Sequence, residues 1–271
     1  MIDYSRELVT LSEYAQANTV SGVTVPGGLA ASAVPKRLVQ ALLSTLGLRL
    51  TRLRQSSTWD LFFLVLKERG FAPKHLVDVG ANHGNWTRTA LKYFPEAYYT
   101  LVEPQDHLRT HVKDLLARDG RIRWIGAGAG DKPGTLPFSI SNFDQCSSFI
   151  YTAEAAKAAE MRQIDVPVTT LNEIVRMGDA PLPDLVKIDA EGFDLRVLAG
   201  ASELVGKTDI FVLEATICAP DNENTLGNVI QTMTLFGYRI FDIHQLFHDP
   251  KSGVLALCDV AFLRNGSHLL D

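Results

Sequence analysis

The stretch HLVDVGANHGNW, residues 75–86, and the stretch YYTLVEPQ, residues 98–105, decide the fold of this chain. The first is an apolar run that ends in an acid, Asp78, and continues into a turn that contains glycine. The second is an apolar run that ends in Glu103. A strand, a glycine-containing turn, a helix and a second strand with a terminal carboxylate are typical of a doubly wound sheet that binds an adenosine-containing ligand.

The spacing of the glycines in this turn argues against a dinucleotide. A G-x-G-x-x-G fingerprint that begins at Gly80 needs glycine at positions 82 and 85, where Asn82 and Asn85 stand. The anionic Asp78 disfavours a pyrophosphate and suits a ligand with a cationic amino group and a cationic sulfonium. S-adenosylmethionine (SAM) is such a ligand. We expect Asp78 beside it and Glu103 on its ribose, and we expect its methionine part to contact Gly80, Ala81, Asn82 and Gly84.

The composition describes an ordinary folded protein and excludes several classes of function. The chain has 271 residues, 46% of them hydrophobic, and a net charge of −5, which gives no electrostatic footprint for nucleic acid. No segment has the ~20 consecutive apolar residues of a membrane span, and the N-terminus does not resemble a secretory signal. The cysteines are odd in number and far apart, which indicates a reduced, cytoplasmic protein: Cys146, Cys218 and Cys258.

Residues 1–57 differ from the rest and are expected to form an N-terminal extension, with the catalytic domain at 58–271. Within the extension, apolar residues recur with helical spacing from Leu38 to Leu53, which predicts an amphipathic helix. We expect this helix to pack on the domain or on a second copy of the chain in a homo-oligomer. Attachment to a membrane surface is the less favoured alternative.

From Trp59 onward, strands and helices alternate, which indicates a parallel sheet with helices on both faces. The last two apolar runs flank HDPKSG, residues 248–253, and are predicted to pair as a hairpin. The sequence therefore predicts an α/β, doubly wound, Rossmann-like fold with a mostly parallel seven-stranded sheet and one antiparallel strand. Thr169 or Thr170 is the expected N-cap of a central helix.

Five motifs together resemble the FkbM family of SAM-dependent methyltransferases, over about residues 75–264: VDVGANHGNWT, VEP, VTTLNEI, DLVKIDAEGFDLRVLAGA and FVLEAT. The most specific piece is KIDAEGFDLRVLAGA, in which Asp194 stands where the family usually has Glu. The resemblance implies a class I methyltransferase. It also implies transfer of a methyl group to a hydroxyl of a sugar, a glycolipid or a glycosylated or polyketide natural product.

Carboxylates at the predicted ends of strands are the candidate functional groups, because ligands of open α/β sheets lie there. Asp131, in the turn after the third strand, is expected to bind the adenine amino group. Asp189 and Glu191 are the candidate bases for the acceptor hydroxyl. Asp189 and Glu214 could also bind Mg²⁺. A metal-free site is favoured, because Ala215 and not a third acid follows Glu214.

Other polar and aromatic residues could have either a functional or a structural role. His244, on a late strand, is a candidate catalytic base, although a structural role is more common for a single histidine. His83 lies in the glycine turn, and Lys187 is expected to pair with an acid. In the loop around residues 143–151, the side chains that could contact substrate or simply pack in the core are Phe143, Phe149, Tyr151, Ser147 and Ser148.

Two alternatives to a methyltransferase come from other classes of protein. An NAD-dependent oxidoreductase would share the fold, but Asn82 and Asn85 count against it. A non-catalytic scaffold with the same fold would have no use for the glycines and acids of the turn.

Overall fold

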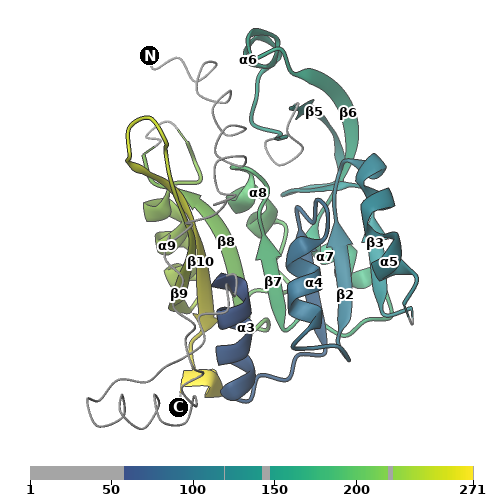
Figure 1. Ribbon diagram of the computed structural model, residues 1–271, viewed down its shortest axis with the longest axis vertical. Coiled ribbons are helices and arrows are strands. Elements are labelled where there is room, and N and C mark those ends of the chain that lie inside the picture. The colour runs from purple at the N-terminus through teal and green to yellow at the C-terminus, as the bar shows by residue number, and fades with distance from the viewer. Residues whose placement is uncertain (1–57, 119, 142–146, 219–221, 271) are drawn as a thin grey trace, which may run out of the picture.

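The computed structural model describes residues 58–118, 120–141, 147–218 and 222–270, which form a seven-stranded sheet with helices around it (Figure 1). The strands are β1 His75–Val79, β2 Tyr98–Val102, β3 Ile122–Ile125, β7 Leu185–Ile188, β8 Ile210–Thr216, β9 Tyr238–His248 and β10 Leu255–Arg264. Their order is β3-β2-β1-β7-β8-β10-β9, and only β10 pairs antiparallel, with β8 and β9. The predicted fold class and the final hairpin are confirmed. The predicted N-terminal helix lies outside the described residues.

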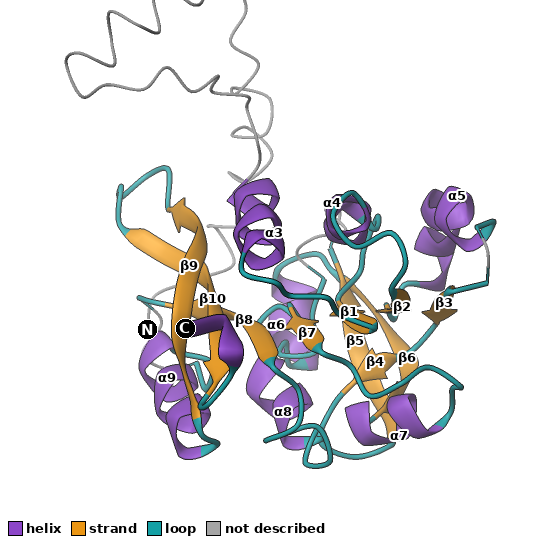
Figure 2. Ribbon diagram, turned by 90° about the horizontal axis from the view of Figure 1, so that it is seen from below, coloured by secondary structure: helices purple, strands orange, loops and turns teal. Residues whose placement is uncertain are grey.

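Helices cover both faces of the sheet (Figure 2). One face carries α3 (Thr58–Glu68), α4 (Asn85–Leu91) and α5 (Lys113–Leu116), and the other carries α7 (Leu171–Arg176), α8 (Asp194–Ala199) and α9 (Leu226–Leu235). Short 3-10 segments, η3 (Asp106–Val112) and η5 (His268–Leu270), precede α5 and end the described chain. None of the helices in the described part of the chain has the length and apolar character of a membrane span.

Alternation along the strands divides the apolar side chains between two cores. Leu76, Leu185 and Val212 pack with Phe62 and Phe63 of α3 on one face of the sheet. On the opposite face, the next residues along the same strands pack with α8 and α9 and include Val77, Val186 and Leu213. Successive strand residues point to opposite faces. Asp78 and Lys187, which stand two positions after Leu76 and Leu185, must therefore lie on the α3 and α4 side.

A second, three-stranded sheet was not foreseen from the sequence. It consists of β4 (Gly128–Ala129), β5 (Gly134–Ile140) and β6 (Arg162–Thr169), in the order β4-β6-β5. With α6 (Ala153–Ala158), it lies at the end of the molecule toward which β2 and β7 point (Figure 1). The sequence indicates an added strand or extended arm at residues 135–141 and a short strand from residue 165, but not their pairing, because the partner of each residue lies more than 20 positions away along the chain.

The helix after this sheet begins where the sequence placed it. The Thr170 side chain accepts a hydrogen bond from the Glu173 amide at 3.1 Å, and the Glu173 carboxylate accepts one from the Thr170 amide at 3.2 Å. This reciprocal capping box identifies Thr170, and not Thr169, as the N-cap of α7.

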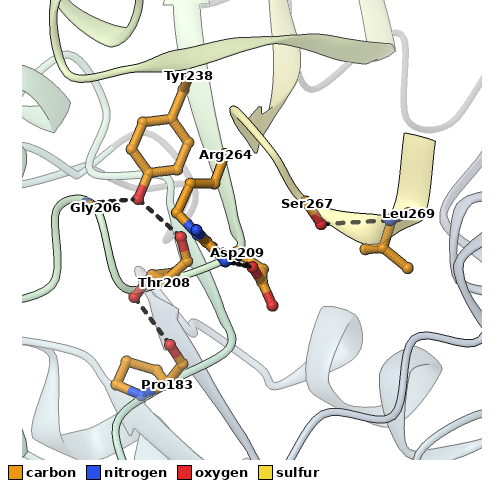
Figure 3. A network of polar contacts seen from close by, with 8 residues as sticks. All are labelled: Pro183, Gly206, Thr208, Asp209, Tyr238, Arg264, Ser267 and Leu269. Carbon is orange, nitrogen blue, oxygen red and sulfur yellow. Dashed lines mark hydrogen bonds and ion pairs between the residues drawn. The ribbon is translucent and has the colours of Figure 1, made fainter. Parts of the chain in front are cut away.

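A hydrogen-bond network joins the starts of β8 and β9 to the end of β10 (Figure 3). The buried Tyr238 hydroxyl donates to the Thr208 carbonyl at 2.7 Å and accepts from the Gly206 amide at 3.0 Å. Next to it, Arg264 pairs with Asp209 at 2.7 Å. These contacts hold the end of the sheet opposite to the carboxyl ends of the parallel strands.

We expect Tyr238→Phe to lower the free energy of unfolding by about 1–3 kcal/mol, because a buried carbonyl and a backbone amide lose their partner. Urea denaturation of the purified chain measures this. Tyr98→Phe is the matched control, since Tyr98 is 41% exposed. Equal losses in the two variants would contradict the structural role of the Tyr238 hydroxyl.

His75 gives the stability of the fold a dependence on pH. Its ring is fully buried, with Nδ1 2.7 Å from the Pro181 carbonyl and Nε2 2.9 Å from the Thr100 hydroxyl. Burial lowers the pKa of His75 from 6.5 to about 4; the Pro181 carbonyl opposes this, and the charge of Arg123 adds to it. The unfolded chain therefore binds a proton between these pH values and the folded chain does not, which destabilises the fold as the pH falls.

We expect this contribution to amount to about 3 kcal/mol between pH 7 and pH 4. His75→Gln should be less stable than the wild type at pH 7, and the difference should shrink toward pH 4. Urea unfolding at a series of pH values measures it, with the exposed His268→Gln as control. A difference that stays constant with pH would contradict the low pKa of His75.

Candidate active site

The loop after β1 is built from residues in left-handed conformations. Gly80, Asn82 and Gly84 have φ values of 72°, 46° and 72°. A Cβ on Gly80 would lie 1.8 Å from the carbonyl oxygen of Asp189, and a Cβ on Gly84 would lie 2.8 Å from Cγ1 of Val112. The sequence assigned these glycines to the approach of a ligand. In the structure, the close packing of the loop against the end of β7 and against η3 already requires them.

Glu103, at the end of β2, holds this loop. One carboxylate oxygen accepts the Asn82 amide at 2.9 Å, and the other accepts the Gln105 amide at 3.0 Å. The side chain is 3% exposed, and burial raises the pKa of Glu103 although both amide bonds oppose the shift. The structure thus brings together the loop and the acid that the sequence assigned to a cofactor.

Asp78, which the sequence places beside the cofactor, has partners within the protein. It is buried in β1, accepts a hydrogen bond from the Thr87 hydroxyl at 2.7 Å and lies 3.5 Å from Nζ of Lys187. Burial raises the pKa of Asp78, and the charge of Lys187 opposes the rise. Asp78 therefore has internal partners, because it stands opposite Lys187 in the register of β1 and β7.

Lys187 is the buried cation of the site. Its Nζ lies 2.9 Å from Oδ2 of Asp189, in addition to its contact with Asp78. Burial alone would lower the pKa of Lys187, but the charges of Asp189 and Asp78 outweigh it and raise the pKa. The predicted pairing of Lys187 with an acid is confirmed.

The turn after β7 is strained. Glu191 has a φ of 52° and Gly192 a φ of 90°, and the first of these is uncommon for a residue with a side chain. The Ser148 hydroxyl donates to the Glu191 carbonyl at 2.7 Å and holds the turn. Strain of this kind persists only where surrounding contacts impose it, and it is frequent at functional sites.

Asp189, Glu191 and Glu214 converge at the carboxyl ends of β7 and β8. Carboxylate oxygens of all three lie within 4.8 Å of one another. The sequence favoured a metal-free site because no third acid follows Glu214; the structure supplies the third carboxylate from Glu191, so the reason for that preference was wrong. Burial, followed by the neighbouring negative charges, raises the pKa of Glu191 and of Glu214.

Two further acids border this cluster and were missed in the sequence. Asp194, the first residue of α8, is fully buried, and neither of its carboxylate oxygens has a hydrogen-bond partner of good geometry. Asp259 stands opposite Glu214 in the β8–β10 register, and burial together with the charge of Asp189 raises its pKa to about 7. The family pattern around Asp194 was a signal for the first. Asp259 lies within an apolar run and gave no signal.

His244 lies one strand beyond the acids. It stands opposite Asp259 in the β9–β10 register, and its ring centre is 5.0 Å from that of Trp59 and 4.8 Å from that of Phe62. Nε2 lies 3.3 Å from Oδ2 of Asp242. Burial lowers the pKa of His244, and the charge of Asp242 opposes this. The structure thus packs His244 beneath α3, with Asp259 between it and the carboxylate cluster.

Two more candidate residues have partners away from the acids. Asp131 forms an ion pair with Arg196 of α8 at 3.1 Å, at the surface. His83 stacks on His111 of η3, with ring centres 4.3 Å apart. The structure therefore pairs Asp131 with α8 and His83 with η3.

Of the loop aromatics, Phe149 packs against other aromatic side chains, and Phe143 lies outside the described residues. Phe149 packs between Phe138 and Phe193, with ring centres at 4.7 and 5.3 Å, and fits against Gly128, where a Cβ would lie 2.4 Å from its ring. Phe149 thus packs against the core. Ser147 accepts a hydrogen bond from the Ser141 amide at 3.0 Å. Phe143 and Cys146 lie outside the described residues.

Three solved structures with similar folds are distant from this chain in sequence. A putative O-methyltransferase from Klebsiella pneumoniae is 14% identical, with a TM-score of 0.45, over 97% of this chain and 100% of that one. A 1,6-didemethyltoxoflavin-N1-methyltransferase from Burkholderia thailandensis, solved with S-adenosylhomocysteine, is 14% identical, with a TM-score of 0.42, over 89% and 93%. A putative caffeoyl-CoA O-methyltransferase from Staphylococcus aureus is 9% identical, with a TM-score of 0.45, over 96% and 98%. At these scores, the similarities carry no argument about function.

A comparison with curated protein sequences gives no match. The family model described as the methyltransferase FkbM domain matches residues 78–240, which include the glycine loop, Glu103 and the converging acids of β7 and β8. The match covers more than half of the chain and the elements that form its site. The chain therefore belongs to the FkbM family of methyltransferases.

Proposed function

We propose that this chain is a SAM-dependent O-methyltransferase whose acceptor is a hydroxyl of a sugar, a glycolipid or a glycosylated or polyketide natural product. The observation that carries the proposal is the contact between two parts of the site. The glycine loop packs so closely on the end of β7 that Gly80 has no room for a Cβ beside the Asp189 carbonyl. A ligand held by the loop and Glu103 therefore lies next to the acids that would act on an acceptor.

The residues present fit SAM. Glu103 is fixed by two backbone amides, and a carboxylate oxygen has more than one lone pair, so it can still accept hydrogen bonds from ribose hydroxyls. In this proposal the carboxylates near the sulfonium are those of Asp189, Glu191 and Glu214, together with Asp78 of β1. Their negative charge disfavours a pyrophosphate, which strengthens the case against NAD. In this proposal Asp131 remains the candidate for adenine.

When bound, SAM supplies a methyl group on a cationic sulfur that leaves as a neutral thioether. The residues of this chain have two tasks: to orient the acceptor hydroxyl in line with that methyl, and to take its proton as the oxygen–carbon bond forms and the carbon–sulfur bond breaks. Asp189 and Glu191 are the favoured groups. The raised pKa of Glu191 makes it a better base than an exposed carboxylate. His244 is less favoured, because it is packed under α3.

The chemistry of the site and the family support the proposed acceptor class. A cluster of carboxylates can accept several hydrogen bonds at once, which suits an acceptor rich in hydroxyl groups. A non-catalytic scaffold is disfavoured, because buried carboxylates without partners destabilise a fold and would bring such a protein no benefit.

We expect Glu103→Ala to weaken the binding of S-adenosylhomocysteine by more than tenfold, because charge-assisted hydrogen bonds contribute about 1.5–3 kcal/mol each. The variant also releases the Asn82 and Gln105 amides. Isothermal titration calorimetry measures the affinity, with NAD titrated in parallel. Glu96→Ala is the control, since Glu96 is an 84% exposed acid in an ion pair with Arg121. Unchanged affinity in a folded Glu103→Ala protein refutes the assignment.

We expect Asp189→Asn and Glu191→Gln to lower methyl transfer by ~10²–10⁴ while the affinity for S-adenosylhomocysteine stays within a few-fold of wild type. The assay is transfer of radiolabelled methyl from SAM to a panel of oligosaccharides, glycolipids and glycosylated polyketides, with amines included. The exposed Glu154→Gln is the control. Full turnover in both variants, or transfer to amines alone, would overturn the proposal.

A further inference from the structure

The carboxyl ends of β7 and β8, with the amino-terminal half of the antiparallel β10 beside them, hold more carboxyl groups than the cation among them balances. Five carboxylates gather there, from Asp189, Glu191, Asp194, Glu214 and Asp259. The buried cation that the structure places with them is Lys187, which also lies near Asp78. A buried carboxylate is costly unless a partner of opposite charge or hydrogen bonds compensate it.

The three innermost acids have the separation that a single cation requires. Oxygens of Asp189, Glu191 and Glu214 lie within 4.8 Å of one another. A cation at ~2.1–2.4 Å from each of two oxygens holds that pair at most about 4.2–4.8 Å apart. Asp189 and Glu191 are partly exposed and Glu214 is buried, so the cluster opens to solvent on one side. An ion could enter from that side and keep positions for water or substrate.

Asp194 is a second, independent observation that points to a cation. It is fully buried, and neither carboxylate oxygen has a hydrogen-bond partner of good geometry, although the backbone amides of Ala190 and Asp194 lie near them. It is close enough to interact with the charges of Asp189, Glu191 and Glu214. Buried polar groups in proteins are nearly always satisfied, so an orphaned carboxylate beside three others indicates a missing positive partner. Metal sites commonly have such a carboxylate behind the ligands, where it orients them or a bound water.

The backbone holds Glu191 in place in a strained conformation. Glu191 keeps its left-handed φ of 52°, with its carbonyl tied to the Ser148 hydroxyl at 2.7 Å. In this conformation the Glu191 carboxylate lies within 4.8 Å of the Glu214 carboxylate. Pre-organised oxygen ligands of this kind suit hard divalent cations.

We propose that Asp189, Glu191 and Glu214 bind one divalent cation of the magnesium or manganese class, with Asp194 behind them. All three ligands are carboxylates, which exclude the soft metals that prefer sulfur. The role of the ion rests on the proposed function: it would orient the acceptor hydroxyl and lower its pKa, and the proton would pass to the carboxylate oxygen of Asp189 or Glu191 that does not bind the ion. The binding itself does not depend on that function.

The test is a titration of the full chain with Mn²⁺, without SAM, in which electron paramagnetic resonance measures the free ion. We expect one Mn²⁺ per chain, displaced by Mg²⁺, and at least a tenfold loss of affinity in Glu214→Gln and in Glu191→Gln. Glu154→Gln, an exposed acid on α6, should bind as the wild type does. Circular dichroism checks the fold of each variant. Should Glu214→Gln fail to fold, Glu191→Gln, at the partly exposed turn, decides.

Absence of stoichiometric Mn²⁺ binding between pH 6.5 and 8.5 would overturn the site, as would wild-type affinity in the folded variants. Such a result would mean that the acids share protons instead of a metal. Calorimetry with S-adenosylhomocysteine on the same samples separates the two proposals. If the chain binds S-adenosylhomocysteine but does not bind Mn²⁺, the cation site alone is refuted. If it binds Mn²⁺ but not S-adenosylhomocysteine, the methyltransferase proposal alone is refuted.

Discussion

The buried ammonium of Lys187 is the interaction on which the rest of the site depends. It lies 2.9 Å from Asp189 and 3.5 Å from Asp78, and so links the carboxyl ends of β7 and β1. Without a cation at this position, two carboxylates would face each other inside the sheet, and one of them would have to take up a proton or move. Removal of one partner from a buried set of paired charges usually lowers the stability of the fold by far more than the intact set contributes to it.

This link also explains why two segments more than 100 residues apart act as one part of the molecule. The loop after β1 and the turn after β7 are in direct backbone contact at Gly80 and Asp189. The loop is tied to β2 through Glu103, and the turn is tied to the second sheet through Ser148. A change at any one of these points moves the others, because packed interiors transmit small displacements.

The sequence predicted the order of strands and helices because apolar periodicity and turn residues are local signals. It also identified Glu103, Asp189, Glu191 and Glu214, since parallel strands bring their carboxyl ends to one edge. It missed Asp259, because an acid in an apolar strand shows its neighbour only when the register of β8 and β10 is known. The pairing of Asp78 with Lys187 was not visible for a related reason: the two residues stand on different strands.

The second sheet and the packing of Phe149 were beyond sequence analysis for the same physical cause. β4 has two residues, and its pairing with β6 depends on a segment far along the chain. Phe149 could have faced a substrate or the core, and the space left by Gly128 decided for the core. Local patterns predict which element a residue belongs to, whereas contacts between elements decide what its side chain touches.

The two amide bonds to Glu103 have a consequence for ligand recognition. A glutamate on an open surface samples several rotamers. A ligand that fixes one of these rotamers loses about 0.5–1.5 kcal/mol of binding free energy to the entropy of that side chain. Here, folding has already removed the freedom, because the Asn82 and Gln105 amides hold both carboxylate oxygens. Whatever hydroxyl group meets Glu103 encounters a receptor whose entropy was lost when the chain folded. The binding free energy of such a ligand then contains the contribution of its hydrogen bonds to Glu103, with little loss from ordering of the protein side chain.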